Sequence, residues 1–130
     1  MQPSYKHYLK IIKNTCTGHE EPVTIPSEEL ADLARLAEEH CTVPFVLSSF
    51  RDTPFYSSML QRTRSMMLNY YQIDQFTRHT VSLLEDNGID CILLKGISLA
   101  SCYPVPEYRK LGDLDLYISR KSDVSKAQRL

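Results

Sequence analysis

The sequence predicts a mixed fold in which a helical amino-terminal region precedes a small α/β core. Apolar residues recur at helical spacing through much of residues 1–87, whereas residues 88–130 contain two short segments with the pattern of strands. Three of the four glycines fall within this second region, where they give the backbone freedom to turn. We therefore expect two regions, 1–87 and 88–130, in a chain whose 130 residues suffice for about one domain.

The first helices are indicated by apolar stripes and by residues suited to begin a helix. Ser4 is a candidate N-cap for a helix over residues 4–13, and Ser27 is a candidate N-cap for a second helix. Between them, residues 15–26 contain one glycine and two prolines without periodicity, so we expect a loop. Further on, Pro44 is expected to interrupt any helix.

A long helical pattern runs from about Tyr56 to Asn87. Five residues lie near one face of this helix: Met59, Met66, Tyr70, Ile73 and Leu84. The pattern fits one helix about 45 Å long, at roughly 1.5 Å per residue, or two helices with a bend. Asn87 and Gly88 are expected to end it, because glycine adopts the left-handed conformation of a C-terminal cap at little cost.

Beyond Gly88 the pattern changes. Residues 90–94 form a compact apolar run typical of a buried strand, and residues 96–102 fit a short helix. Residues 113–118 alternate apolar and polar side chains as a strand does. A further helix is expected from Ser122 to the end of the chain.

Composition and charge exclude several classes of protein. Hydrophobic residues at 42% and charged residues at 24% are typical of a soluble globular protein. A net charge of -1 gives no overall attraction to nucleic acid or to an anionic membrane, so an anionic ligand needs a local site. No apolar run has the length of a signal peptide or a membrane span, so we expect a cytoplasmic protein without membrane contact. The four cysteines and four histidines lack the spacing of a zinc site or a disulfide framework.

Asp113 and Asp115 are separated only by Leu114 in the second predicted strand, so their carboxylates are expected on one face. Two such carboxylates repel each other unless a cation lies between them. Mg²⁺ typically takes one or two protein carboxylates and completes its shell with water and substrate phosphates. An exposed alternating strand explains the same pattern, so the pair alone leaves both interpretations open.

Lys95 and Gly96 follow the first predicted strand and open the short helix. Gly96 lets the backbone approach a phosphate closely, and Ser98 adds a hydroxyl. The GxxxxGK[ST] pattern of a P-loop is absent from the sequence.

Residues 92–118, ILLKGISLASCYPVPEYRKLGDLDLYI, resemble the core of an uncharacterised nucleotidyltransferase family of the DNA polymerase β-like superfamily. Its members carry an LKG turn, a Tyr-Pro segment, an arginine and then Gly-Asp-hydrophobic-Asp. The matching residues are Leu94, Lys95, Gly96, Leu99, Ala100, Tyr103, Pro104, Pro106, Arg109, Gly112, Asp113 and Asp115. A less specific resemblance extends over residues 27–130.

The resemblance implies a fold in which a helix and two or three strands hold a Mg-nucleoside triphosphate. Asp113 and Asp115 would be the catalytic carboxylates and the ligands of Mg²⁺. The residues implied in nucleotide binding are Lys95, Gly96, Ser98 and Arg109. The acceptor of the nucleotidyl group is open: a protein side chain, a sugar or a small molecule fits, whereas the near-neutral charge does not favour nucleic acid.

The sequence also departs from the superfamily pattern. Members generally use a Gly-Ser or Gly-Gly turn, whereas Ile97 separates Gly96 from Ser98 here. A third carboxylate normally comes from a later strand, and Asp123 is the only acid that follows Asp115. We therefore expect a C-terminally truncated fragment of an enzyme, inactive by itself. The alternative is a non-catalytic helical interaction module, or pseudo-enzyme, that keeps the nucleotidyltransferase outline.

Overall fold

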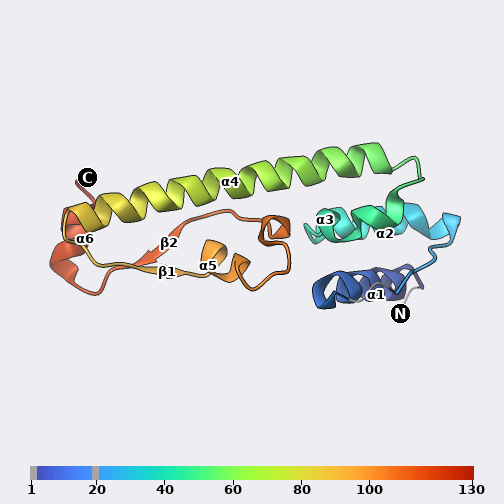
Figure 1. The fold of residues 1–130 in the computed structure, drawn as a ribbon, viewed down its shortest axis with the longest axis horizontal. Coiled ribbons are helices and arrows are strands. Elements are labelled where there is room, and N and C mark those ends of the chain that lie inside the picture. Colours follow the sequence, from blue (N-terminus) through green and yellow to red (C-terminus); the bar gives the residue numbers. More distant parts are fainter. Residues whose placement is uncertain (1–2, 19–20) are drawn as a thin grey trace.

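The structure, a computed structural model, describes residues 3–18 and 21–130. It is mostly helical, with one two-stranded antiparallel sheet near the carboxyl end of the chain. The molecule is elongated, and its two termini lie near opposite ends (Figure 1). The predicted fold class, helices followed by a small sheet, is confirmed.

The helical core combines three helices with the first turns of a fourth. The helices are α1 (Pro3–Thr17), α2 (Leu30–Glu39), α3 (Val43–Val46) and α4 (Tyr56–Asp86), with 3-10 turns at Ser27–Glu29 and Leu47–Phe50. One apolar cluster joins them, formed by Tyr8, Ile11, Leu33, Ala34, Ala37, Val43, Val46, Phe50 and Met59. Burial of this cluster, more than helix propensity, holds these short helices together.

Both predicted N-caps are wrong. Ser4 lies inside α1, where it is buried, because the helix begins at Pro3. Ser27 opens a 3-10 turn without a side-chain cap, and its hydroxyl contacts the carboxylate of Glu28 instead. The residue types at these two positions are compatible with N-caps. The packing of α1 and the turn before α2 instead determine where each helix begins.

The loop predicted over residues 15–26 is shorter than expected, because α1 continues to Thr17. A tertiary contact supports the extra turn: the Thr15 hydroxyl donates to the Phe45 carbonyl over 2.8 Å. Residues 19 and 20 of this prediction lie outside the described residues. Pro44 does not exclude a helix, since it lies in the first turn of α3, where a missing N–H is tolerated.

The long helical pattern forms one continuous helix, α4, of 31 residues. Its buried residues are Met59, Thr63, Thr77 and Leu84, so the predicted face is right but the two threonines were not foreseen. Gly88 ends the helix with a φ of 68°, and the backbone N–H of Ile89 donates to the Leu84 carbonyl, as in a Schellman motif. None of the described helices combines the length and apolarity needed to cross a membrane.

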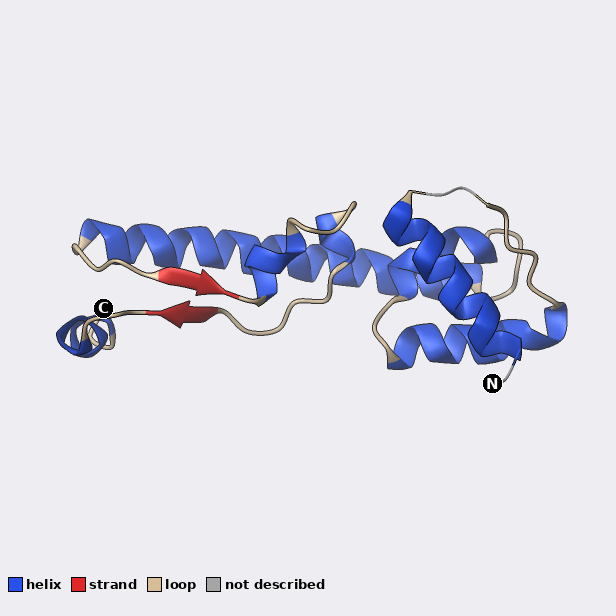
Figure 2. Ribbon diagram, turned by 90° about the horizontal axis from the view of Figure 1, so that it is seen from below, coloured by secondary structure: helices blue, strands red, loops and turns tan. Residues whose placement is uncertain are grey.

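The strands β1 (Ile92–Leu94) and β2 (Asp115–Tyr117) lie beside each other and alongside the C-terminal half of α4 (Figures 1 and 2). The chain between them forms α5 (Gly96–Ala100) and a 3-10 turn at Pro106–Tyr108. After β2 the chain forms α6 (Lys121–Ala127), which ends three residues earlier than the helix expected up to Leu130.

The prediction of a buried first strand is wrong. β1 is shorter than residues 90–94, and the side chains of Ile92 and Leu94 are 60% and 41% exposed. β1 and β2 are the only strands among the described residues, and a two-stranded sheet leaves part of its apolar surface uncovered.

Polar contacts fix this second region to α4. The Asn69 amide donates to the buried Leu111 backbone carbonyl over 2.8 Å. The Tyr71 hydroxyl donates to the Glu107 carboxylate over 2.8 Å, and this hydrogen bond raises the pKa of Tyr71 above its ordinary value. The segment that leads into β2 is therefore positioned by the middle of α4.

Candidate functional site

The antiparallel pairing of β1 and β2 brings the predicted site residues to one end of the sheet. Leu94 lies opposite Asp115, so the chain leaves β1 at the point where β2 begins. Asp115 is the first residue of β2, and Asp113 precedes the strand by two residues. The turn at Lys95 therefore lies beside the segment that carries both aspartates.

The backbone of this turn is unusual at two successive residues. Lys95 has a φ of 42° and a ψ of -145°, a conformation that residues with a side chain rarely adopt. Gly96 follows with a φ of 40°. A Cβ atom at Gly96 would lie 3.4 Å from the Asp113 carbonyl oxygen, so glycine permits both the conformation and the close approach of the two segments.

Lys95 and Asp115 form an ion pair across the end of the sheet. The Lys95 Nζ lies 3.2 Å from Asp115 Oδ2, with 70% of the lysine side chain and 39% of the aspartate side chain exposed. A pair so open to solvent contributes little to folding stability. Its significance is its position, because it sets an ammonium group against one of the two predicted metal-binding carboxylates. Asp113 is exposed.

Arg109 contacts the turn through a hydrogen bond and is itself held by Tyr103. Its Nε donates to the Gly96 carbonyl over 3.2 Å, and its Nη1 donates to the Tyr103 hydroxyl over 3.0 Å. The guanidinium carbon lies 5.5 Å from the centre of the Tyr103 ring. These bonds use two of the five N–H donors of the arginine and hold its half-buried side chain in one orientation.

Ser98 makes a contact within its own turn. Its hydroxyl donates to the Lys95 carbonyl over 2.6 Å, so its hydrogen is committed to the backbone. The structure thus links four of the predicted residues by contacts between the turn and the aspartate segment, namely Lys95, Gly96, Asp113 and Asp115, with Arg109 attached through Gly96.

Carboxylate oxygens are the donors that Mg²⁺ prefers, so the two aspartates suit this ion in chemistry and in number. Within residues 3–18 and 21–130, no group of three or more His, Cys, Asp and Glu side chains gathers into a metal site. Asp123 lies in the first turn of α6, as expected, and its carboxylate is 3.9 Å from Arg120. Asp113 and Asp115 are therefore the two carboxylates whose chain segment lies beside the turn.

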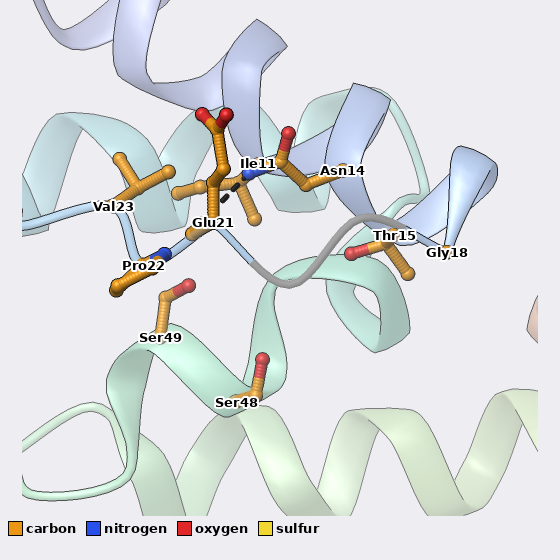
Figure 3. Close-up of a pocket in the computed structure, with 9 residues that line it drawn as sticks. All are labelled: Ile11, Asn14, Thr15, Gly18, Glu21, Pro22, Val23, Ser48 and Ser49. Carbon is orange, nitrogen blue, oxygen red and sulfur yellow. Dashed lines mark hydrogen bonds between the residues drawn. The ribbon is translucent and has the colours of Figure 1, made fainter.

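A cavity of about 590 Å³ lies in the helical region, away from these contacts along the chain. Figure 3 shows its wall, to which the end of α1 contributes Asn14 and Thr15 and the turn after α3 contributes Ser48 and Ser49. None of the six predicted site residues lines it. A second cavity, of about 310 Å³, is lined by Arg109 and therefore adjoins the turn.

Sequence reasoning gave no site role to Tyr103, which orients Arg109. The Tyr-Pro segment of the matched motif was the available signal. His40 also lines the second cavity, and its distance along the chain from Arg109 gave no sign of this proximity.

A model of the family described as "Uncharacterised nucleotidyltransferase" matches residues 26–130, which is most of the chain. The matched segment contains the turn, Arg109 and both aspartates. Neither the curated proteins nor the solved structures gave a match to this chain. The chain therefore belongs to the uncharacterised nucleotidyltransferase family, and its general function is nucleotidyl transfer.

Proposed function

We propose that the chain binds a Mg-nucleoside triphosphate at the turn of Lys95 and Gly96, with Asp113 and Asp115 as the metal-binding carboxylates. The observation that carries this proposal is the strand register, which sets the turn against the aspartate segment. Phosphate-facing backbone and carboxylates on neighbouring segments are the two parts that such a site requires.

In the proposed reaction the acceptor hydroxyl oxygen forms a bond to the α-phosphorus of the triphosphate. The bond from that phosphorus to the β-phosphate oxygen breaks, pyrophosphate leaves and the hydroxyl proton passes to water. Bound Mg²⁺ would supply positive charge that favours the attacking oxygen and the leaving group. The part of the protein is to hold the ion and to place the triphosphate beside it.

Each basic residue has a separate part in this placement. The Lys95 side chain is mostly exposed, so its ammonium is free to turn from Asp115 towards a phosphate oxygen. Arg109 is already oriented by Gly96 and Tyr103, so little side-chain entropy is lost when its remaining donors meet an anion. Gly96 lets the turn lie against the backbone of Asp113, and its place at the start of α5 puts it where a phosphate would meet backbone N–H groups.

We also propose that residues 1–130 bind the nucleotide without transferring it. The resemblance implies a third carboxylate beside the aspartate pair, whereas no group of three or more potential metal-binding side chains gathers among the described residues.

Calorimetry with MgCl₂ and the α,β-methylene analogues of the four common ribonucleoside triphosphates tests the proposal. The double variant Asp113→Ala with Asp115→Ala should weaken this binding at least about tenfold. A tenfold loss of affinity corresponds to roughly 1.4 kcal/mol, and the loss of a hydrogen bond to a charged group typically costs more than that. Incubation of the same protein with labelled triphosphates should give no transfer.

The matched control is Asp52→Ala with Asp86→Ala, which removes two exposed acids from other parts of the chain. This variant should bind as the parent does. Equal binding by both double variants and the parent would refute the metal assignment and favour the non-catalytic module.

A further inference from the structure

The second cavity described above, of about 310 Å³, lies where the helical core meets the chain between α5 and β2. We name it the junction cavity. Its aromatic walls come from both regions. The ring centre of Phe45 in α3 lies 6.0 Å from that of Tyr103 and 5.5 Å from that of Tyr108. Figure 1 shows the chain between α5 and β2 turning close to α3. The volume is near the lower end of the range for small-molecule sites.

The charge of the junction cavity has one sign. Arg109 and Lys110 contribute permanent positive charges, and His40 adds a third when protonated. None of the described residues that line the cavity is acidic. Aromatic walls with basic groups suit a ligand that combines a flat ring with a negative charge.

Arg109 connects the junction cavity to the proposed nucleotide turn. The same guanidinium that lines the cavity donates to the Gly96 carbonyl, so a molecule in the cavity lies next to the turn. An acceptor needs this neighbourhood, because its hydroxyl must reach the α-phosphorus.

Part of the cavity wall lies outside the segment that matches the family. Ile12 and Cys16 come from α1, whereas the match begins at residue 26. The turn and the aspartates, by contrast, lie wholly within the match. A wall built partly from outside the shared segment is suited to selecting a ligand particular to this protein, which describes an acceptor better than the nucleotide.

We infer that the junction cavity binds the acceptor and that the acceptor carries a flat ring and an anionic group. This role rests on the proposed function, since an acceptor has meaning only beside a nucleotide site. The ring contacts Phe45, Tyr103 and Tyr108, and the anionic group pairs with Lys110 and a free donor of Arg109.

The cysteines provide a direct test. Cys16 and Cys41 line the junction cavity, whereas Cys91 and Cys102 do not. Cys102 is exposed, as Cys16 is, and serves as the matched control. The whole chain is pulsed with iodoacetamide, and alkylation at each cysteine is measured by mass spectrometry with and without phenyl phosphate.

Saturating phenyl phosphate should slow alkylation of Cys16 and Cys41 at least threefold and leave Cys102 unchanged. Inorganic phosphate has the charge without the ring, and benzyl alcohol has the ring without the charge, so each should protect at concentrations at least tenfold higher. Lys110→Met should weaken protection by phenyl phosphate but not by benzyl alcohol. Absence of protection, or equal slowing at all four cysteines, would overturn the inference.

A second arm repeats the pulse with the Mg-bound nucleotide analogue that binds best in calorimetry. Phenyl phosphate should still protect Cys16 and Cys41 in its presence. Protection by the nucleotide itself, with displacement of phenyl phosphate, would assign the cavity to the nucleobase and overturn the acceptor role. If no analogue binds but phenyl phosphate protects, the proposed function and the acceptor role fail, while a site for flat anions stands.

Discussion

Lys95 has a backbone conformation that lowers the stability of the folded protein. A residue with a side chain in this region of φ and ψ costs about 1–3 kcal/mol, and such residues cluster at functional sites. This conformation lies at the turn from β1 into α5, and the ammonium of the same residue pairs with Asp115. Strain and a proposed ligand contact thus coincide at one residue.

Replacement of Lys95 separates these two effects. Lys95→Gly should keep or raise the free energy of unfolding, by up to about 1 kcal/mol, because relief of strain exceeds the added entropy of the unfolded chain. Binding of the Mg-nucleotide should weaken, since the ammonium is lost. Thermal denaturation and calorimetry measure the two quantities.

Lys95→Ala is the matched variant, because it removes the ammonium but retains a Cβ atom and therefore the strain. It should be less stable than Lys95→Gly and bind nucleotide equally weakly. A glycine variant as unstable as the alanine variant would show that the turn is not strained.

For single residues of the candidate site, the sequence predicted which residue types are present better than it predicted their contacts. The glycine at position 96 signalled a turn, but nothing in the sequence indicates a positive φ at the preceding lysine. Arg109 was expected to bind the nucleotide, and no sequence pattern indicated that it also donates to Gly96 and Tyr103. Contacts across the turn depend on the backbone route, which residue spacing alone does not determine.

Two threonines on the buried face of α4 differ in the hydrogen bonding of their hydroxyl groups. Thr63 and Thr77 are each 3% exposed. The Thr77 hydroxyl donates to the Ile73 carbonyl over 2.7 Å, whereas the Thr63 hydroxyl has no hydrogen-bond partner among the described residues. A buried hydroxyl without a partner costs roughly 1–3 kcal/mol.

Thr63→Val should therefore raise the free energy of unfolding by about 1 kcal/mol, because a methyl group replaces an unsatisfied hydroxyl of similar size. Thr77→Val, on the same face of the same helix, should lower it or leave it unchanged, because a hydrogen bond is lost. Urea denaturation of both variants measures the difference. A loss of stability in Thr63→Val as large as that in Thr77→Val would contradict the expectation.

Elements with a long periodic pattern were the predictable ones. The stripe of α4 and its end at Gly88 follow from the sequence, because they depend on local spacing and on one glycine. The length of α1 depends on Thr15 reaching Phe45, and the exposure of β1 depends on how few strands neighbour it. Both features depend on tertiary contacts, which a local sequence pattern does not contain.

The molecule is unevenly packed along its length. The apolar cluster joins α1, α2, α3 and the start of α4. Around the sheet, Ile89, Ala100 and Leu111 are buried outside this cluster, and several apolar side chains of the strands are exposed. Hydrogen bonds such as that from Asn69 to Leu111 connect the sheet region to α4. Regions with few buried apolar contacts open at lower free energy.

Hydrogen exchange should resolve this difference. Amides of β1 and β2 are expected to exchange at least about tenfold faster than those in the first half of α4, because opening the sheet exposes little apolar surface. Saturating Mg-nucleotide should slow exchange at the strands, since a ligand that binds only the closed state stabilises it. Equal protection of both regions in the free protein would show that the chain opens as one unit.

The two-stranded sheet also has a consequence for the protein in concentrated solution. Within the described residues each strand pairs with the other alone, so one edge of each has backbone N–H and C=O groups without a strand partner. Such edges, beside the exposed side chains of Ile92, Leu94 and Tyr117, are where a strand of another molecule adds most readily. With three residues in each strand, an added strand gains few hydrogen bonds. The brevity of the strands thus limits aggregation that their composition favours.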